Sequence, residues 1–258
     1  MSSGLNLEPF RAFIGELAAA SGPIIRRHFW NPALAVEQKS DRTPVTVADR
    51  EAEAALRKLI NARFPQHGII AEEFGPERAE DEWTWVLDPI DGTKSFVHGV
   101  PLFGTLIGLL HEGQPVLGAI HQPILDLLCV GDGLETKLNG QPVRVREMRT
   151  LAEATLLNTD VVDSAKRHDP AAWKRLVGAT KLVRTWGDCY GYLLVATGMA
   201  DVMCDPIMNV WDVLPLVPII RGAGGVITDW SGGEVGDQKS CLAANPRLHR
   251  LALDLLLT

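Results

Sequence analysis

The stretch Trp83-Thr84-Trp85-Val86-Leu87-Asp88-Pro89-Ile90-Asp91-Gly92-Thr93 decides the fold. Its first five residues are rich in aromatic and β-branched side chains and predict a buried strand. The two carboxylates that follow therefore lie where a strand ends and the chain turns. Oxygen ligands at a rigid turn suit a hard cation such as Mg²⁺. If a helix or tight turn begins at Gly92, its backbone N–H groups could bind a phosphate beside that cation.

The composition is that of an ordinary globular chain. Its 258 residues are 46% hydrophobic and 22% charged, enough for one large domain or two small ones. The net charge is −7 and no long basic run is present, which argues against nucleic acid as a partner. The four cysteines form no Cys-x-x-Cys pair and no disulfide framework, which fits a reducing cytoplasm.

The sequence also lacks the patterns of membrane and zinc proteins. Gly or Pro interrupts every apolar stretch well before the roughly 18 residues that a membrane helix needs. The first residues lack the basic and apolar pattern of a signal peptide. None of the seven histidines has ligand spacing, so we expect none of them to be catalytic. We therefore expect a cytoplasmic protein with no membrane partner.

The first half predicts helices packed on an antiparallel sheet. Apolar residues at helical spacing predict a helix over residues 7–30, and Thr46 with Asp49 begins a second helix in a capping-box pattern. Strands are expected over residues 68–71, 83–87, 105–110, 116–121 and 125–130. Short, punctuated connections join the last three, which predicts a meander.

The second half predicts alternating strands and helices, which is the α/β pattern. A turn near residue 140 divides the chain into an α+β half (1–140), which carries most of the metal ligands, and an α/β half (141–258). Strands are expected over residues 156–159, 181–184, 201–204 and 226–228, and helices over 171–177, 188–199 and 211–221. Pro215 and Pro218 should bend or break the last helix.

Four acids stand at the ends of predicted elements, where they could gather around one metal cluster: Glu72, Asp88, Asp91 and Asp212. Hydrolysis of a phosphomonoester needs a nucleophilic water, neutralised phosphoryl oxygens and help for the leaving oxygen. Two or more Mg²⁺ ions supply all three. Thr93 could orient the water while its hydroxyl donates to a carboxylate. Asp49 could close that relay, and Lys39 could add positive charge or be a solvated loop residue.

Each of these residues also has a plainer interpretation. The Asp88–Asp91 pair could form only a turn, and Asp49 could simply cap its helix. Glu72 could only solvate a strand end, and Asp212 could be an ordinary acid at a helix N-terminus.

Together the residues resemble the inositol monophosphatase family. The resemblance is carried by residues 85–93 and by Trp211-Asp212-Val213 followed by Gly222-Ala223-Gly224-Gly225. Residues 43–49 and Ala71-Glu72-Glu73 support it, and it extends from about residue 10 to the end of the chain. It implies a layered αβαβα sandwich of the inositol monophosphatase and fructose-1,6-bisphosphatase type. The α+β and α/β halves would then hold the site between them.

The resemblance also implies the roles of the site residues. Metal ligands would be Glu72, Asp88, Asp91, Asp212 and the carbonyl of Ile90, and catalytic residues would be Glu72, Thr93 and Asp49. The backbone at Gly92 and Thr93 would hold the phosphate of a small phosphorylated substrate. The family further implies two or three Mg²⁺ ions per site, Mn²⁺ as a possible substitute, inhibition by Li⁺, and a homodimer.

Within the family, the chain is most similar to the histidinol-phosphatases of histidine biosynthesis. The carrying residues are 184–192, 205–212 and Lys94-Ser95-Phe96. Histidinol phosphate carries an ammonium and an imidazole. Extra carboxylates in the second half of the chain could pair with these groups. Asp188 and Asp205 are the candidates, and Asn209 could bond the imidazole. Inositol-type members usually have a small or hydroxyl residue at position 188 and glutamate at 205, but Asp188 could also be a plain helix cap.

The sequence therefore leaves four hypotheses about the function. The leading one is a Mg²⁺-dependent histidinol-phosphatase, and the second is a phosphatase acting on inositol 1-phosphate or a related sugar phosphate. A 3′,5′-bisphosphonucleoside phosphatase is weaker, since no insertion for base stacking is evident. A binding protein that only keeps the fold is disfavoured, because burying four acids together without cations is costly.

Overall fold

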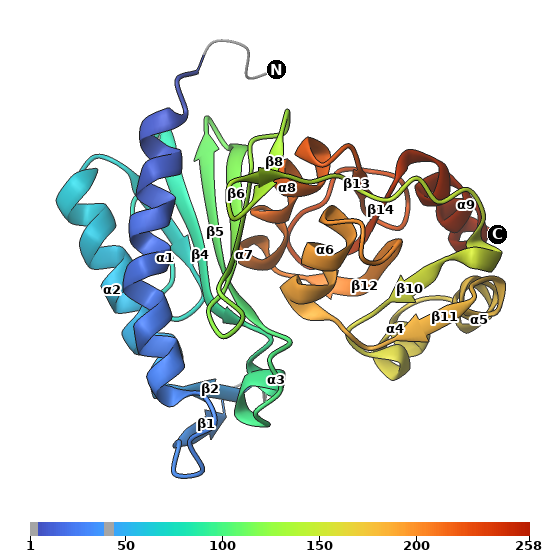
Figure 1. The fold of residues 1–258 in the computed structure, drawn as a ribbon, viewed down its shortest axis with the longest axis horizontal. Coiled ribbons are helices and arrows are strands. Elements are labelled where there is room, and N and C mark those ends of the chain that lie inside the picture. Colours follow the sequence, from blue (N-terminus) through green and yellow to red (C-terminus); the bar gives the residue numbers. More distant parts are fainter. Residues whose placement is uncertain (1–4, 39–43) are drawn as a thin grey trace.

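The computed structural model describes residues 5–38 and 44–258, and it forms five layers in the order helix, sheet, helix, sheet, helix (Figure 1). The predicted αβαβα sandwich is confirmed. Lys39, for which the sequence left two interpretations, lies outside the described residues, as does Thr43.

The first sheet has the strand order β3-β4-β5-β6-β7-β8-β9. Its strands are β3 (Gly68–Ala71), β4 (Trp83–Asp91), β5 (Gly104–His111), β6 (Gln114–Gln122), β7 (Leu127–Gly131), β8 (Thr136–Leu138) and β9 (Gln141–Pro142). β3 runs parallel to β4, and every other pair is antiparallel, so the predicted meander is confirmed. Because β9 pairs with β8, this sheet extends to Pro142, past the division predicted at residue 140.

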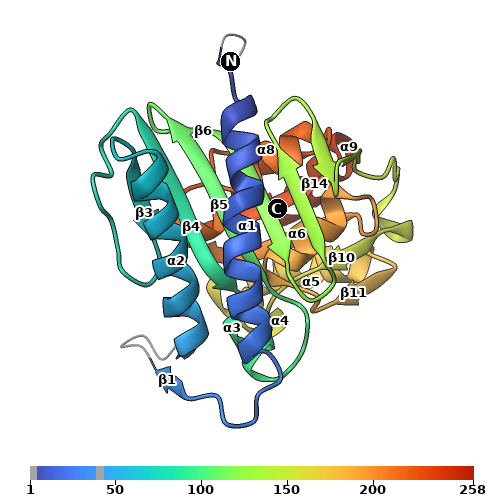
Figure 2. The same cartoon turned by 60° about the vertical axis from the view of Figure 1, so that its left-hand side comes forward.

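Two helices cover the outer face of this sheet, α1 (Glu8–His28) and α2 (Val47–Arg63), as Figure 2 shows. Their apolar stripes, which include Phe13, Leu17 and Leu56, pack with Trp85 in one buried cluster. Thr46 caps α2 and Asp49 completes the capping box, as predicted. The short strands β1 (Val36–Gln38) and β2 (Pro44–Thr46) pair antiparallel before α2 begins.

The second sheet has the order β11-β10-β12-β14-β13. Its strands are β10 (Thr155–Leu157), β11 (Leu182–Arg184), β12 (Val202–Met208), β13 (Val226–Thr228) and β14 (Lys239–Ala244). β10 is parallel to both of its neighbours, so the carboxyl ends of β10, β11 and β12 share one edge of the sheet. Ligands commonly bind at such an edge in α/β sheets.

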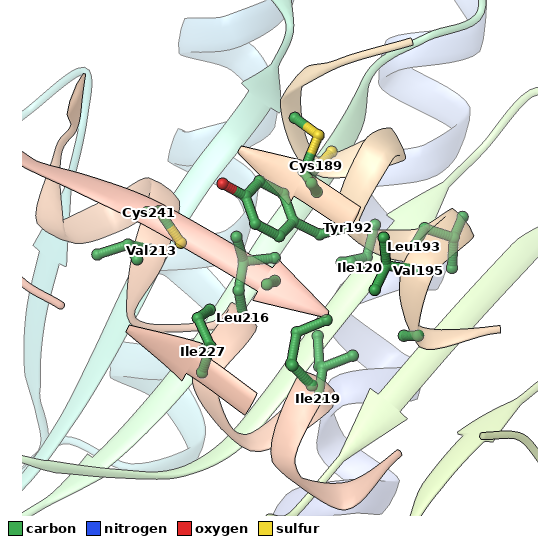
Figure 3. Close-up of a cluster of buried hydrophobic side chains, with 14 of the residues drawn as sticks. Ile120, Cys189, Tyr192, Leu193, Val195, Val213, Leu216, Ile219, Ile227 and Cys241 are labelled. Carbon is green, nitrogen blue, oxygen red and sulfur yellow. The ribbon is translucent and has the colours of Figure 1, made fainter. Parts of the chain in front are cut away.

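The middle layer lies between the sheets and consists of α6 (Asp188–Ala196), α7 (Val210–Val213) and α8 (Leu216–Gly222). Figure 3 shows how Tyr192, Leu216 and Ile219 from these helices meet Ile120 of the first sheet and Cys241 of the second. The contact is close. A Cβ at Gly118 on β6 would lie 1.9 Å from the carbonyl oxygen of Pro215, so only glycine lets α8 approach.

The outer helical layer consists of α4 (Val161–Arg167), α5 (Pro170–Ala179) and α9 (Pro246–Leu257), and a 3₁₀ turn (Leu151–Glu153) precedes β10. The helix predicted over residues 211–221 breaks at Pro215 into α7 and α8, which is one of the two outcomes expected from its prolines. Pro218 is tolerated inside α8. The helices within residues 5–38 and 44–258 all lack the combination of length and apolar character needed to span a bilayer.

Candidate active site

Three carboxylates from two elements meet between the layers. Asp88 and Asp91 lie at the end of β4, and Asp212 lies in the first turn of α7. One oxygen from each lies within 4.8 Å of the others, a spacing at which a single ion could bind all three. The register of β4 against β5 shifts between Asp88 and Asp91. Such an irregularity redirects side chains along a strand, and here both acids reach the cluster.

Hydrogen bonds from neighbouring elements hold two of the three acids. The backbone N–H of Cys189, in the first turn of α6, donates to Asp91 Oδ2 at 2.5 Å. The backbone N–H and side-chain amide of Asn209 donate to Asp212 Oδ2 at 2.9 and 3.1 Å. The side-chain oxygen of Asn209, Oδ1, in turn accepts from the side-chain amide of Gln238. Asn209, predicted to bond the substrate, is thus already engaged in orienting Asp212.

Glu72 follows β3 and lines the same small cavity of about 140 Å³ as the three aspartates, although it is not part of the close trio. The turn after it is fixed by Glu53, a buried acid of α2 that accepts from the N–H groups of Glu73 and Phe74. Arg57 donates to Glu53 at 2.8 Å. Sequence reasoning did not identify Glu53. Its position three residues before Leu56, on the buried face of the helix, was the available signal.

The electrostatics of the cluster fit a divalent cation. Burial, together with the charges of neighbouring acids, raises the pKa of Asp88 and Asp91 well above the ordinary value. Burial also raises the pKa of Asp212 to about 7 and that of Asp49 to about 6, and the charge of Glu72 adds to both effects. In addition, Asp49 Oδ1 is buried without a hydrogen-bond partner. Acids that repel one another and lack water are stabilised by bound cations.

The predicted relay from Thr93 to a carboxylate differs from the structure. The Thr93 hydroxyl donates to the carbonyl of Ile90 at 3.0 Å. Asp49 Oδ2 accepts both the N–H and the hydroxyl of Thr46, at 2.8 and 2.6 Å. The carbonyl oxygen of Ile90, rather than a carboxylate, is therefore the partner of Thr93. The sequence could not distinguish the Ile90 carbonyl from the Asp91 carboxylate as the partner, because both residues lie within three positions of Thr93.

Gly92 stands where only glycine fits. It has φ 92° and precedes the short helix α3 (Thr93–Val97). A Cβ there would lie 2.8 Å from the carbonyl oxygen of Leu102 and 3.1 Å from Asp188 Oδ2. The first N–H groups of a helix have no partner inside it, so those at the start of α3 remain the predicted phosphate ligands.

A larger cavity of about 430 Å³ adjoins the cluster at the carboxyl edge of the second sheet. The two cavities share lining residues, namely Asp91, Lys94, Thr159, Asp188 and Asp212. Asp205, also in the lining, is buried and accepts from the N–H of Thr159 and the hydroxyl of Tyr192. The site therefore consists of an acid cluster that opens into a roomier chamber.

Asp188 is not the plain helix cap that the sequence left open. Gly187 occupies the cap position of α6, and Asp188 is the first helical residue, with a left-handed φ of 50°. Within the described part of the chain no hydrogen bond reaches its carboxylate, and burial near Asp205 and Asp212 raises its pKa to about 7. Its carboxylate is therefore available to a ligand in the chamber.

Comparison with known proteins identifies the family of the chain. The model of the inositol monophosphatase family matches residues 6–257. The chain belongs to the inositol monophosphatase family. Its relatives include a protein of Arabidopsis thaliana named bifunctional phosphatase IMPL2, chloroplastic, which is 42% identical over 89% of this chain and 67% of the relative. A histidinol-phosphatase of Chlorobaculum parvum is 40% identical over 91% of this chain and 92% of the relative.

Solved structures place the fold in the same family. An inositol monophosphatase from Zymomonas mobilis superposes with a TM-score of 0.88 at 34% identity, covering 98% of this chain and all of that one. Family membership supports a metal-dependent reaction at the acid cluster. The individual roles of the site residues remain predictions.

The raised pKa values give this family member a testable pH dependence. An aspartate has a pKa near 4 in the unfolded chain, so the native state holds more protons than the unfolded state as pH rises from about 4 through about 7. The stability that these protons bring is lost over that window. Without metal, the melting temperature should therefore fall by several degrees between pH 5 and pH 8, and Mg²⁺ should stabilise the protein more at pH 8. Calorimetry of the wild type and of Asp212→Asn, with and without Mg²⁺, measures both effects. An equal pH slope in the two proteins would contradict the assignment.

Proposed function

We propose that the chain is a Mg²⁺-dependent histidinol-phosphatase, which hydrolyses L-histidinol phosphate to L-histidinol and phosphate. The chain is a phosphomonoesterase, since its family and the names of its relatives agree on that reaction class. The substrate is the open part of the proposal. The observation that carries it is Asp188, an available acid in the chamber beside the acid cluster.

Six aspartates and three basic residues, Lys94, Lys166 and Arg167, line the chamber, so acids outnumber bases where a cationic leaving group would lie. An ammonium or imidazolium bound there would meet Asp188 directly, with the buried Asp205 behind it. A charge-assisted hydrogen bond to such an acid is stronger than a neutral one. The polyol ring of an inositol phosphate carries no positive charge, so it would leave Asp188 with only the charge of Lys94 to balance it, in a site where burial disfavours the charged form. This contrast favours histidinol phosphate, as does the name of the Chlorobaculum relative.

The proposed mechanism assigns each residue a task. Divalent cations held by Asp88, Asp91, Asp212, Glu72 and the Ile90 carbonyl would neutralise the phosphoryl oxygens and acidify a water. Cys189 and Asn209 orient two of these acids through their hydrogen bonds. We assign phosphate binding to the N–H groups at Gly92 and Thr93. Orientation of the attacking water falls to Glu72 and Thr93, and Asp49, which Thr46 orients, adds a further buried carboxylate near Glu72.

A substrate panel tests the proposal. With Mg²⁺, kcat/KM for L-histidinol phosphate should exceed that for inositol 1-phosphate and for glycerol 2-phosphate by at least about tenfold, which corresponds to one charge-assisted contact of about 1.4 kcal/mol. Phosphate release should stop when EDTA removes the metal. A tenfold preference for inositol 1-phosphate would instead establish the alternative function. The homodimer, the cytoplasmic location and the division into two halves stay predictions.

A further inference from the structure

Thr159 stands between the two acids of the chamber. It follows β10, in the carboxyl edge that β10 shares with β11 and β12. Its backbone N–H donates to Asp205 Oδ1 at 3.0 Å, and its hydroxyl oxygen accepts from the backbone N–H of Asp188 at 2.8 Å. One residue therefore binds the side chain of one acid and the backbone of the other. Neither the sequence patterns nor the proposed mechanism assigned it a role.

The hydrogen bond from Asp188 to Thr159 acts on a strained part of the backbone. Asp188 has a left-handed φ of 50°, which a residue with a side chain keeps only when its surroundings hold it. The preceding Gly187 lies directly against Thr159, where a Cβ would come within 2.3 Å of the Thr159 Cα. The first turn of α6 is thus held on one side by Thr159 and on the other by the bond from Cys189 to Asp91.

The support behind Thr159 is rigid. Asp205 is buried and also accepts from the hydroxyl of Tyr192, itself fully buried in the middle layer (Figure 3). The neighbouring Asn158 donates to the carbonyl oxygen of Cys204 and to Ser164, which ties the end of β10 to β12 and α4. The position of Thr159 is therefore set by the second sheet and not by the acid cluster.

We propose that Thr159 is a positioning residue for substrate choice: it fixes the backbone of Asp188 so that the carboxylate faces the cationic part of the substrate. The inference rests on the proposed function. In this proposal Thr159 contacts neither the phosphate nor the metal. Removal of the Thr159 hydroxyl should therefore affect recognition of the leaving group and leave the chemistry of the phosphoryl group intact.

Two substitutions separate the hydroxyl from the shape of the side chain. Thr159→Val has nearly the same shape and keeps the N–H that binds Asp205, but it removes the hydroxyl, which accepts from Asp188 N–H and also donates to the Asp205 carboxylate. Thr159→Ser keeps the acceptor and removes only a methyl group. With the Mg²⁺-loaded enzyme, Thr159→Val should raise KM for L-histidinol phosphate roughly tenfold, as an unpaired buried donor does, with kcat within about twofold. Its KM for glycerol 2-phosphate should stay within about twofold, and Thr159→Ser should resemble the wild type on both esters.

A double-mutant cycle then tests whether Thr159 acts through Asp188. In an Asp188→Asn background, Thr159→Val should raise KM for L-histidinol phosphate by less than about twofold, because coupled sites are non-additive. Full additivity would overturn the inference. A KM for L-histidinol phosphate unchanged in Thr159→Val would also overturn it, as would equal losses on both esters, which would indicate an effect on Asp91 through Cys189. If the wild type itself shows no preference for L-histidinol phosphate, the proposed function fails and the inference fails with it.

Discussion

Asp91→Asn should remove nearly all turnover while leaving the fold intact. Asp91 is one of the three acids whose oxygens lie within 4.8 Å of each other, and Cys189 already fixes its orientation. An amide keeps the shape but loses the charge that a divalent cation needs. Metal ions contribute several kcal/mol to the transition state, so kcat should fall about 10³-fold or more.

The same substitution should not cost stability. Burial and the charges of Asp188 and Asp212 raise the pKa of Asp91, so the charged form is disfavoured in the metal-free protein. Asp91→Asn should therefore melt at the same temperature as the metal-free wild type at pH 8, or higher, and it should bind Mg²⁺ weakly in calorimetric titration. Asp254→Asn is the matched control, because Asp254 is an exposed acid of α9 that lies outside the trio and lines neither cavity of the site. Retention of more than half the activity in Asp91→Asn would contradict the role of this residue.

Asp188→Asn should raise KM for L-histidinol phosphate by about 10- to 100-fold, the range expected for losing a hydrogen bond between charged groups. Asparagine is the right replacement because it tolerates the left-handed φ of 50° that Asp188 adopts, whereas alanine would add backbone strain. The KM for glycerol 2-phosphate, which has no cationic group, should change by less than about threefold.

Stability and metal binding serve as controls for this second substitution. Asp188→Asn should keep most of the Mg²⁺ affinity of the wild type, because Asp188 is not part of the close trio and acts on Asp91 only through its charge. Asp188→Ala should show the same loss of substrate preference together with a lower melting temperature. Equal increases in KM for both esters would mean that Asp188 supports the fold and does not select the substrate.

Local sequence predicted the parts of the fold and site that depend on neighbouring residues. The strand before Asp88, the capping box at Thr46 and the meander over β5 to β7 all follow from short patterns, and all are confirmed. The break at Pro215 was one of two outcomes that the prolines allowed. The helices α4 and α9 were not predicted.

The rest of the site depends on contacts between distant parts of the chain. The bond from Cys189 to Asp91 joins residues 98 positions apart in the sequence, and no periodicity indicates it. Thr159 meets Asp205 only because β10 and β12 are neighbours in the sheet. The sequence offered Asp188 as a substrate contact or, alternatively, a plain cap, but it did not indicate the left-handed backbone at this residue. These features can be recognised only in the folded structure.

The most direct test is an anomalous diffraction map of crystals soaked in Mn²⁺, measured together with Mn²⁺-dependent phosphate release from the same preparation. The account predicts at least one strong peak within ligation distance, about 2.2 Å, of carboxylate oxygens from Asp88, Asp91 and Asp212. An active, Mn²⁺-saturated enzyme whose anomalous peaks all lie away from those three side chains would contradict it.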